Sequence, residues 1–171
     1  MGAVIAFTLV VHVTNLSDVP RPLMLAAEAT VETMFRHAGI EIAWVDDPAG
    51  ESRHVATRLI ILPRGGGSIG NRFDAILGAA ARPAEGVATA WVFFERVEEH
   101  ADRHAVPLDR LLACTIAHEL GHVVQRSPGH SDRGLMRASW GSVEYRRAAL
   151  GRLEMTRADL EGRRSDAPSA P

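Results

Sequence analysis

The residues best suited to chemistry in this sequence are two histidines four positions apart, His118 and His122, with Glu119 beside the first. On a helix, side chains four residues apart lie on one face, one turn from each other, so both imidazoles can bind the same zinc ion. The glutamate can then take a proton from a zinc-bound water. The spacing therefore predicts a hydrolytic zinc site on a helix, with Glu119 as the general base and acid.

A hydrolytic zinc site usually takes three protein ligands and keeps a fourth position for water. His130 is available just after Pro128-Gly129, a dipeptide that ends the helix and turns the chain back. Asp132 and Glu144 are alternatives, because carboxylates also bind zinc. The preferred set of zinc ligands is His118, His122 and His130.

Together with the sequence that follows it, the motif resembles the zincin metalloproteases, in particular the metzincin branch and small predicted bacterial members of it. The resemblance rests on the segments His118–His122, His130–Ser131 and Gly134–Trp140. It implies hydrolysis of peptide bonds in a peptide or protein substrate. It also implies that Met136 forms a Met-turn, with its side chain packed beneath the zinc ligands.

The sequence departs from the metzincin pattern at two points. Gln125 stands where that family has a glycine, and His130 follows His122 by eight residues instead of six. Glu144 offers a second resemblance, to the gluzincin branch, in which a second helix supplies a glutamate ligand. A gluzincin-like peptidase is thus one alternative, and a zinc-binding regulatory or binding domain with little turnover is another. If Glu144 is not a ligand, we expect an exposed acid paired with Arg147.

Five other residues could carry chemistry, but we expect structural roles for them. Cys114 lies one turn before the motif and should pack as a small buried residue. Tyr145 could donate a hydrogen bond to an oxyanion, although packing is the simpler role for it and for Trp140. His100 and His104 have the spacing of metal ligands, yet their segment is highly charged, so an exposed helical face is expected.

The helix that carries the motif is expected over about Leu108–Gln125. Apolar residues on one side of it, such as Leu112 and Ile116, can pack on a sheet while the histidines on the other side face a cleft. Composition and periodicity predict strands at 4–13, 40–45, 55–62, 75–81 and 89–94, and helices at about 20–37 and 141–149 and after Thr156.

These elements predict one α/β (α+β) domain over 1–161, followed by a disordered tail at 162–171. We expect a twisted mixed sheet of about five strands, with a backing helix, the motif helix and an edge strand beside the cleft. The zincin resemblance implies that an extended peptide binds along this edge as an added strand. Small side chains would leave the edge accessible at Gly78, Ala79 and Ala80. A plain short edge strand is the alternative.

Composition limits the class of protein further. The 171 residues, of which 46% are hydrophobic, suit a single domain with its own core. A net charge of −2 gives no preference for nucleic acid or an anionic membrane, so neither is an expected partner. No apolar run reaches the roughly 18 residues of a membrane span. The single cysteine excludes an internal disulfide.

A cytoplasmic protein and an exported protein that has lost its signal peptide both fit this composition, and the oligomeric state is open.

Overall fold

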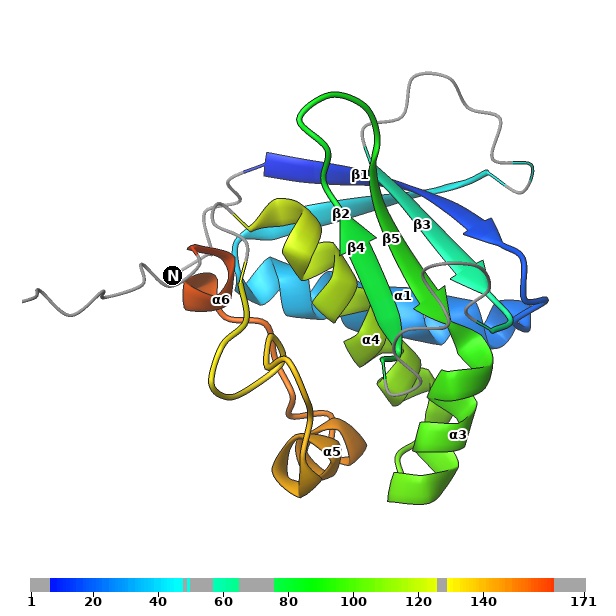
Figure 1. Cartoon of the computed structure of the whole chain (residues 1–171), viewed down its shortest axis with the longest axis vertical. Coiled ribbons are helices and arrows are strands. Elements are labelled where there is room, and N and C mark those ends of the chain that lie inside the picture. Colours follow the sequence, from blue (N-terminus) through cyan, green and yellow to red (C-terminus); the bar gives the residue numbers. More distant parts are fainter. Residues whose placement is uncertain (1–6, 48, 50–56, 65–75, 126–128, 162–171) are drawn as a thin grey trace, which may run out of the picture.

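The computed structural model describes residues 7–47, 49, 57–64, 76–125 and 129–161. The described residues form a five-stranded mixed sheet with helices packed on it, which confirms the predicted mixed α/β class (Figure 1). The expected tail at 162–171 lies outside the described residues, as do the first residues of three predicted strands. The elements are β1 (Phe7–Asn15), α1 (Arg21–His37), β2 (Ile40–Asp46), β3 (Thr57–Leu62), β4 (Gly78–Ala81), β5 (Ala88–Phe93), α3 (Phe94–His104), α4 (Leu108–Val124), α5 (Ser142–Ala149) and α6 (Arg157–Glu161).

The sheet has the strand order β2-β1-β3-β5-β4. Three of its four strand pairings are parallel, whereas β4 runs antiparallel to β5. A parallel pair requires a crossover, and α1 supplies the one between β1 and β2. The strand predicted at 75–81 is therefore an edge strand, as expected, and the apolar strand predicted at 89–94 lies inside the sheet.

One face of the sheet carries the core. On β3, Leu59 and Ile61 are fully buried while their neighbours are only partly so, which is the alternation of a strand with one packed face. Helices α1 and α4 contact each other and this sheet, α1 at β2 and α4 at β3, β4 and β5 (Figure 1). Phe35 of α1 and Ile116 of α4 are both 0% exposed in this layer.

The motif helix α4 is more deeply buried than its sequence pattern predicts. From Leu111 to Val123 every residue is buried except His118 and His122, which are half-buried. Helix α4 also contacts helices α1, α3, α5 and α6. The fold thus closes over α4 and leaves two histidines reachable from outside.

The C-terminal segment returns to the end of α4. The short helix predicted after Thr156 is present as α6, and its first turn is closed as expected. The Asp159 amide donates to the Thr156 hydroxyl at 3.2 Å, and the Thr156 amide donates to the Asp159 carboxylate at 2.9 Å. In the described residues no helix is both long and apolar enough to reach across a membrane.

Candidate metal centre

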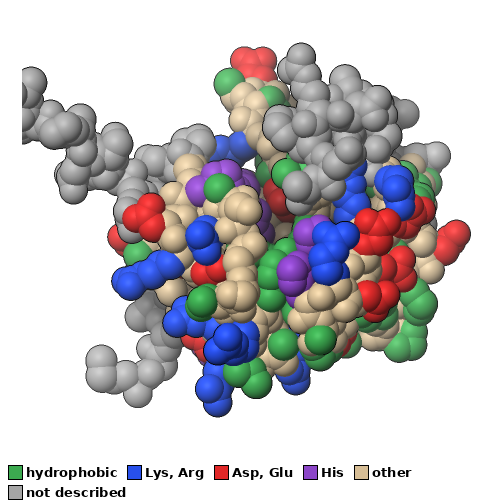
Figure 2. All heavy atoms as spheres, turned by 60° about the horizontal axis from the view of Figure 1, so that its bottom comes forward, with side chains coloured by type: hydrophobic (Ala, Val, Ile, Leu, Met, Phe, Trp, Pro, Cys, Tyr) green, Lys and Arg blue, Asp and Glu red, His purple; other side chains and the backbone are tan. Residues whose placement is uncertain are grey.

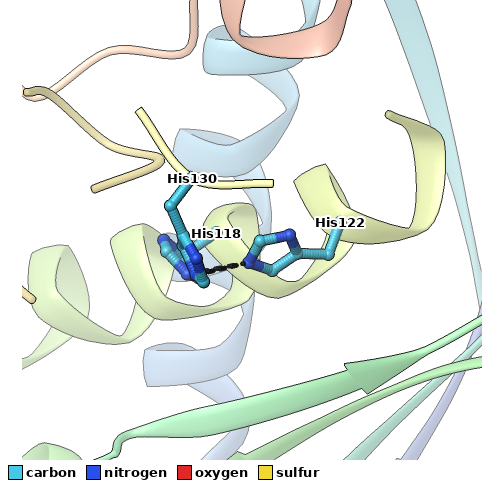
Figure 3. Close-up of side chains that lie close together, drawn as sticks. All are labelled: His118, His122 and His130. Carbon is cyan, nitrogen blue, oxygen red and sulfur yellow. Dashed lines mark hydrogen bonds between the residues drawn. The ribbon is translucent and has the colours of Figure 1, made fainter. Parts of the chain in front are cut away.

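Three imidazoles meet at the C-terminal half of α4. The Nε2 atom of His122 lies 3.1 Å from Nε2 of His118 and 3.1 Å from Nε2 of His130. One ligand atom from each residue falls within a group no wider than 4.8 Å. Figure 3 shows the three rings pointing toward one another, two from the helix and one from the segment that passes over it. The structure therefore brings together the three histidines expected as ligands.

The orientation of His118 is set by the chain that follows His130. Its Nδ1 lies 2.8 Å from the carbonyl oxygen of Leu135, which also accepts the indole N–H of Trp140 at 3.0 Å. A carbonyl oxygen can only accept, so Nδ1 of His118 carries the proton. The lone pair of this imidazole is then on Nε2, inside the histidine cluster.

The orientation of His122 is set by a buried glutamine. Nδ1 of His122 lies 3.1 Å from Oε1 of Gln125, and Nε2 of Gln125 donates to the backbone carbonyl of Asp159 at 2.8 Å. Because that carbonyl can only accept, the amide nitrogen of Gln125 faces Asp159 and its oxygen faces His122. His122 therefore also carries its proton on Nδ1 and directs a lone pair into the cluster.

The loop that carries His130 is held in place by two hydrogen bonds of the next residue, Ser131. The amide of Ser131 donates to the Met136 carbonyl at 2.8 Å, and its hydroxyl donates to the Asp159 carboxylate at 2.8 Å. The longer spacing after His122 does not keep His130 away from the other two histidines, because these bonds hold the loop over α4. The residues of the expected turn at 126–128 lie outside the described part of the chain.

The donor set fits a zinc ion. Burial lowers the pKa of His118 to about 4, and burial followed by the neighbouring His130 lowers the pKa of His122, so both are neutral near pH 7. Neutral imidazoles with lone pairs on Nε2 are the form that binds metal. With no proton between His118 and His122, nitrogen lone pairs 3.1 Å apart repel, and a cation among them would remove that cost. A catalytic zinc ion takes three protein ligands and keeps one position open, and the cleft beside the three histidines would leave such a position free.

Glu119 lies on the sheet side of the same cleft. Its side chain is wedged against β4, where a Cβ atom added at Gly78 would lie 2.7 Å from Cγ of Glu119 and 2.6 Å from the Trp91 carbonyl. Only glycine fits at this point. Burial raises the pKa of the Glu119 carboxyl to about 8, which is the expected effect of moving a carboxylate out of water.

Met136 packs against the middle of the motif. It is 0% exposed, and a Cβ atom added at Gly121 would lie 2.6 Å from its sulfur. The glycine before His122 thus makes room for this methionine. The expectation that Met136 lies under the metal ligands came only from the zincin resemblance, and the structure places the side chain directly against the helix turn between them.

A cleft of about 960 Å³ runs past the three histidines and Glu119, large enough for several residues of a peptide. Its walls are β4 on one side and the segment 137–142 with Tyr145 on the other. Figure 2 shows histidine side chains in two groups on this face of the molecule, on either side of a hollow. Residues of the predicted edge strand line it at Gly78, Ala79 and Ala80. Arg82 fixes this strand to the helix by donating to the Val123 and Gln125 carbonyls.

The rival ligands do not join the cluster, which among the described residues consists of the three histidines. Glu144 accepts the Gly141 amide at 2.9 Å and a guanidinium N–H of Arg137 at 2.8 Å. Its side chain is only 4% exposed, so the expectation of an exposed acid paired with Arg147 was wrong. Its role as an N-terminal cap of α5 explains the burial. Asp132 is exposed.

The second histidine pair was placed only partly correctly by the sequence. Glu98 and Glu99 of α3 are exposed, as expected for a solvated face. His104 is exposed, as expected, whereas His100 is half-buried, and both line the cleft. Nδ1 of His100 lies 2.8 Å from the Tyr145 hydroxyl, and the His104 ring stacks on Tyr145 with 3.7 Å between the ring centroids. The charge of α3 signalled exposure, whereas contact with α5 depends on tertiary packing. As expected, Cys114 is buried, and its burial raises the thiol pKa to about 12.

Sequence reasoning missed Gln125, which is hydrogen-bonded to His122, and Asp159, which is hydrogen-bonded to Gln125 and Ser131. Gln125 had a usable signal, since it lies three residues after His122 and so on the same side of the helix end. Asp159 had none beyond its capping pattern with Thr156. No protein family model matches this chain, and no curated protein matches its sequence.

Proposed function

We propose that this protein is a zinc-dependent metallopeptidase of the zincin type, with a metzincin-like arrangement of ligands. The observation that carries the proposal is the convergence of three imidazole nitrogens, from His118, His122 and His130, beside a buried glutamate in an open cleft. Two of the three imidazoles have their outer nitrogen bonded to an oxygen acceptor, which is how metal-binding histidines are usually held. Structural histidines would not need this arrangement.

His118, His122 and His130 would hold the zinc ion, which would supply a Lewis acid for the carbonyl and lower the pKa of water to about 7. Glu119, which lines the same cleft, would accept the proton that the attacking water loses and pass it to the leaving amine. Its carboxylate needs a fixed direction for this, and the close approach of Gly78 supplies it. A positive charge near Glu119 would also favour its ionised form over the neutral form that burial favours.

The cleft suits an extended peptide. β4 lies at the edge of the sheet and is four residues long with small side chains, so its outer backbone groups are accessible to a pairing segment. Gly78 is the β4 residue that contacts Glu119, so a peptide paired along this edge would pass the proposed catalytic group. The substrate is accordingly a peptide or protein segment that binds with its backbone.

Two alternatives make different demands on the same residues. A gluzincin-like site with Glu144 as ligand would require that carboxylate to leave both Gly141 and Arg137, which makes it the weaker option. A zinc-binding domain without turnover would use the same three histidines but would not need Glu119.

The decisive experiment is metal analysis combined with Glu119→Gln. We expect one zinc ion per chain in both proteins, and loss of cleavage of a peptide library by about 10²–10⁴-fold in the variant, because proton transfer is removed while the ligands stay. Glu98→Gln on the exposed face of α3 is the matched control and should cleave normally. Equal activity in Glu119→Gln would contradict the peptidase, and zinc loss in Glu144→Ala but not His130→Ala would contradict the ligand set.

A further inference from the structure

We propose that Asp159, in the C-terminal helix α6, is a positioning residue of the metal centre that holds two of the three histidines at once. The inference rests on the proposed metal-binding function and goes beyond it, because it places the end of the chain in the site. Asp159 touches neither cleft nor imidazole. It acts on His122 through Gln125 and on His130 through Ser131.

The first branch starts at the backbone of Asp159. Its carbonyl accepts the amide N–H of Gln125 at 2.8 Å and so turns the amide oxygen toward Nδ1 of His122 at 3.1 Å. Gln125 is 2% exposed, which leaves water little access to compete for either group. If Gln125 were reversed, its NH₂ group would face His122, and the imidazole would move its proton to Nε2. That proton would occupy the lone pair that metal binding requires.

The second branch starts at the carboxylate of Asp159. One oxygen accepts the Ser131 hydroxyl at 2.8 Å, and the other accepts the hydroxyl and the amide of Thr156 at 2.6 and 2.9 Å. The Thr156 bonds fix the carboxylate to the first turn of its own helix. The Ser131 bond then fixes the residue that follows His130 to the same point. His130 is the exposed member of the triad, so this attachment limits its movement.

The segment that carries Asp159 is itself anchored in the core. Leu153 is 1% exposed and Met155 is 2% exposed. A Cβ atom added at Gly121 would lie 3.0 Å from the Met155 methyl group, so this segment packs against the motif helix. α6 is only five residues long, and its position depends on these contacts. The geometry therefore joins the end of the chain to the metal centre through packing and through two hydrogen-bond branches.

The first test is made on the metal-free protein. Ring nitrogen chemical shifts from long-range proton–nitrogen correlation spectra report which nitrogen of His122 carries the proton. We expect the Nδ1–H form in the wild type and a shift toward Nε2–H in Gln125→Leu, while Gln125→Glu, which keeps an oxygen acceptor, should retain Nδ1–H. An unchanged His122 tautomer in Gln125→Leu would overturn the first branch, whether or not the wild type binds zinc.

The second test measures zinc affinity by competition with a chromophoric chelator. Partners that orient metal ligands typically contribute 10- to 100-fold in affinity, so we expect losses of about that size in Ser131→Ala and in Asp159→Asn. Asp159→Asn keeps the backbone carbonyl and hence the Gln125 branch, so its His122 tautomer should be unchanged. Ser17→Ala and Asp102→Asn, away from the site, are the matched controls.

The outcomes separate positioning from a merely structural role. If Asp159→Asn and Ser131→Ala lower the melting temperature of the metal-free protein but bind zinc as tightly as the wild type, the second branch is overturned. If the wild type itself binds no zinc, the proposed metallopeptidase fails. The tautomer measurement then decides alone whether Gln125 orients His122.

Discussion

The proposed metal centre is built from two parts of the chain, a regular helix and an irregular loop. Helix α4 supplies His118, Glu119 and His122 at a spacing fixed by regular hydrogen bonding, and nearly every side chain around them is buried. The segment after it supplies His130 from an irregular loop that is held by individual hydrogen bonds. The Leu135 carbonyl of this loop accepts from His118, the Ser131 amide donates to the Met136 carbonyl, and the Ser131 hydroxyl donates to the Asp159 carboxylate. A helix can place two ligands by local geometry alone, whereas the third must be placed by contacts between residues distant in sequence.

The largest expected effect is on peptide cleavage, and it should come from the contact between Glu119 of helix α4 and Gly78 of the edge strand β4. Gly78→Ala would place a methyl group 2.7 Å from Cγ of Glu119 and 2.6 Å from the Trp91 carbonyl, so the glutamate must move. We expect cleavage to fall by about 10²–10⁴-fold, as for loss of a general base, while bound zinc stays at the wild-type level.

Peptide cleavage and metal content are the two measurements for this variant. Ala80→Gly, in the same strand and lining the same cleft, is a control that adds no atoms. Normal cleavage by Gly78→Ala would show that the direction of Glu119 is not set by β4.

The next largest effect should be on stability, at the contact between Gly121 of helix α4 and Met136 of the loop that follows it. Gly121→Ala gains up to about 1 kcal/mol of helix propensity, but overpacking a filled core usually costs about 1–3 kcal/mol. The added Cβ would lie 2.6 Å from the Met136 sulfur, and Met136 is fully buried, so the clash should win. We expect a net loss of about 1 kcal/mol in the free energy of unfolding, measured with urea.

A double-mutant cycle tests the cause of this loss. Met136→Ala removes the clashing sulfur, so Gly121→Ala made in that background should be neutral or stabilising. Additive losses would mean that the two residues do not compete for the same space.

The same difference between helix α4 and the loop after it decides which site residues could be predicted from the sequence. His118, Glu119 and His122 follow from helix periodicity, and the sheet class follows from the alternation of apolar residues, because both are local properties of the chain. Placing His130 depended on its availability after a turn. Asp159 lies 34 residues from Gln125 along the chain, and no local pattern connects them. Burial of Glu144 was also missed, since its partner Arg137 precedes the helix it caps.

A smaller effect on stability and zinc affinity should come from a hydrogen bond within the loop after α4, between Trp140 and Leu135. Trp140→Phe removes the indole N–H that donates to the Leu135 carbonyl at 3.0 Å, while that carbonyl still accepts Nδ1–H of His118. Loss of one such bond costs about 0.5–1.5 kcal/mol in the free energy of unfolding. We expect this loss together with a small decrease in zinc affinity, since Leu135 becomes less firmly placed.

Trp44→Phe is the matched control, because Trp44 donates a similar bond at 3.0 Å to Glu32, far from the centre. It should lose comparable stability and keep its zinc affinity. Equal zinc affinity in both variants would indicate that the loop needs no help from Trp140 to orient His118.

The smallest effect is expected at Cys114, whose thiol should not react at all in the folded protein. Burial raises its pKa to about 12, so the thiol stays protonated at every pH below that value, and it is 2% exposed. Only the thiolate reacts with alkylating reagents. Native protein at about pH 8 should therefore remain unmodified by mass spectrometry, whereas Ser139→Cys, at an exposed position of the loop part, should be alkylated at that position only. Both cysteines should react in denaturant. Alkylation of native Cys114 would show that α4 opens, and the contrast between a closed helix part and an exposed loop part would then be wrong.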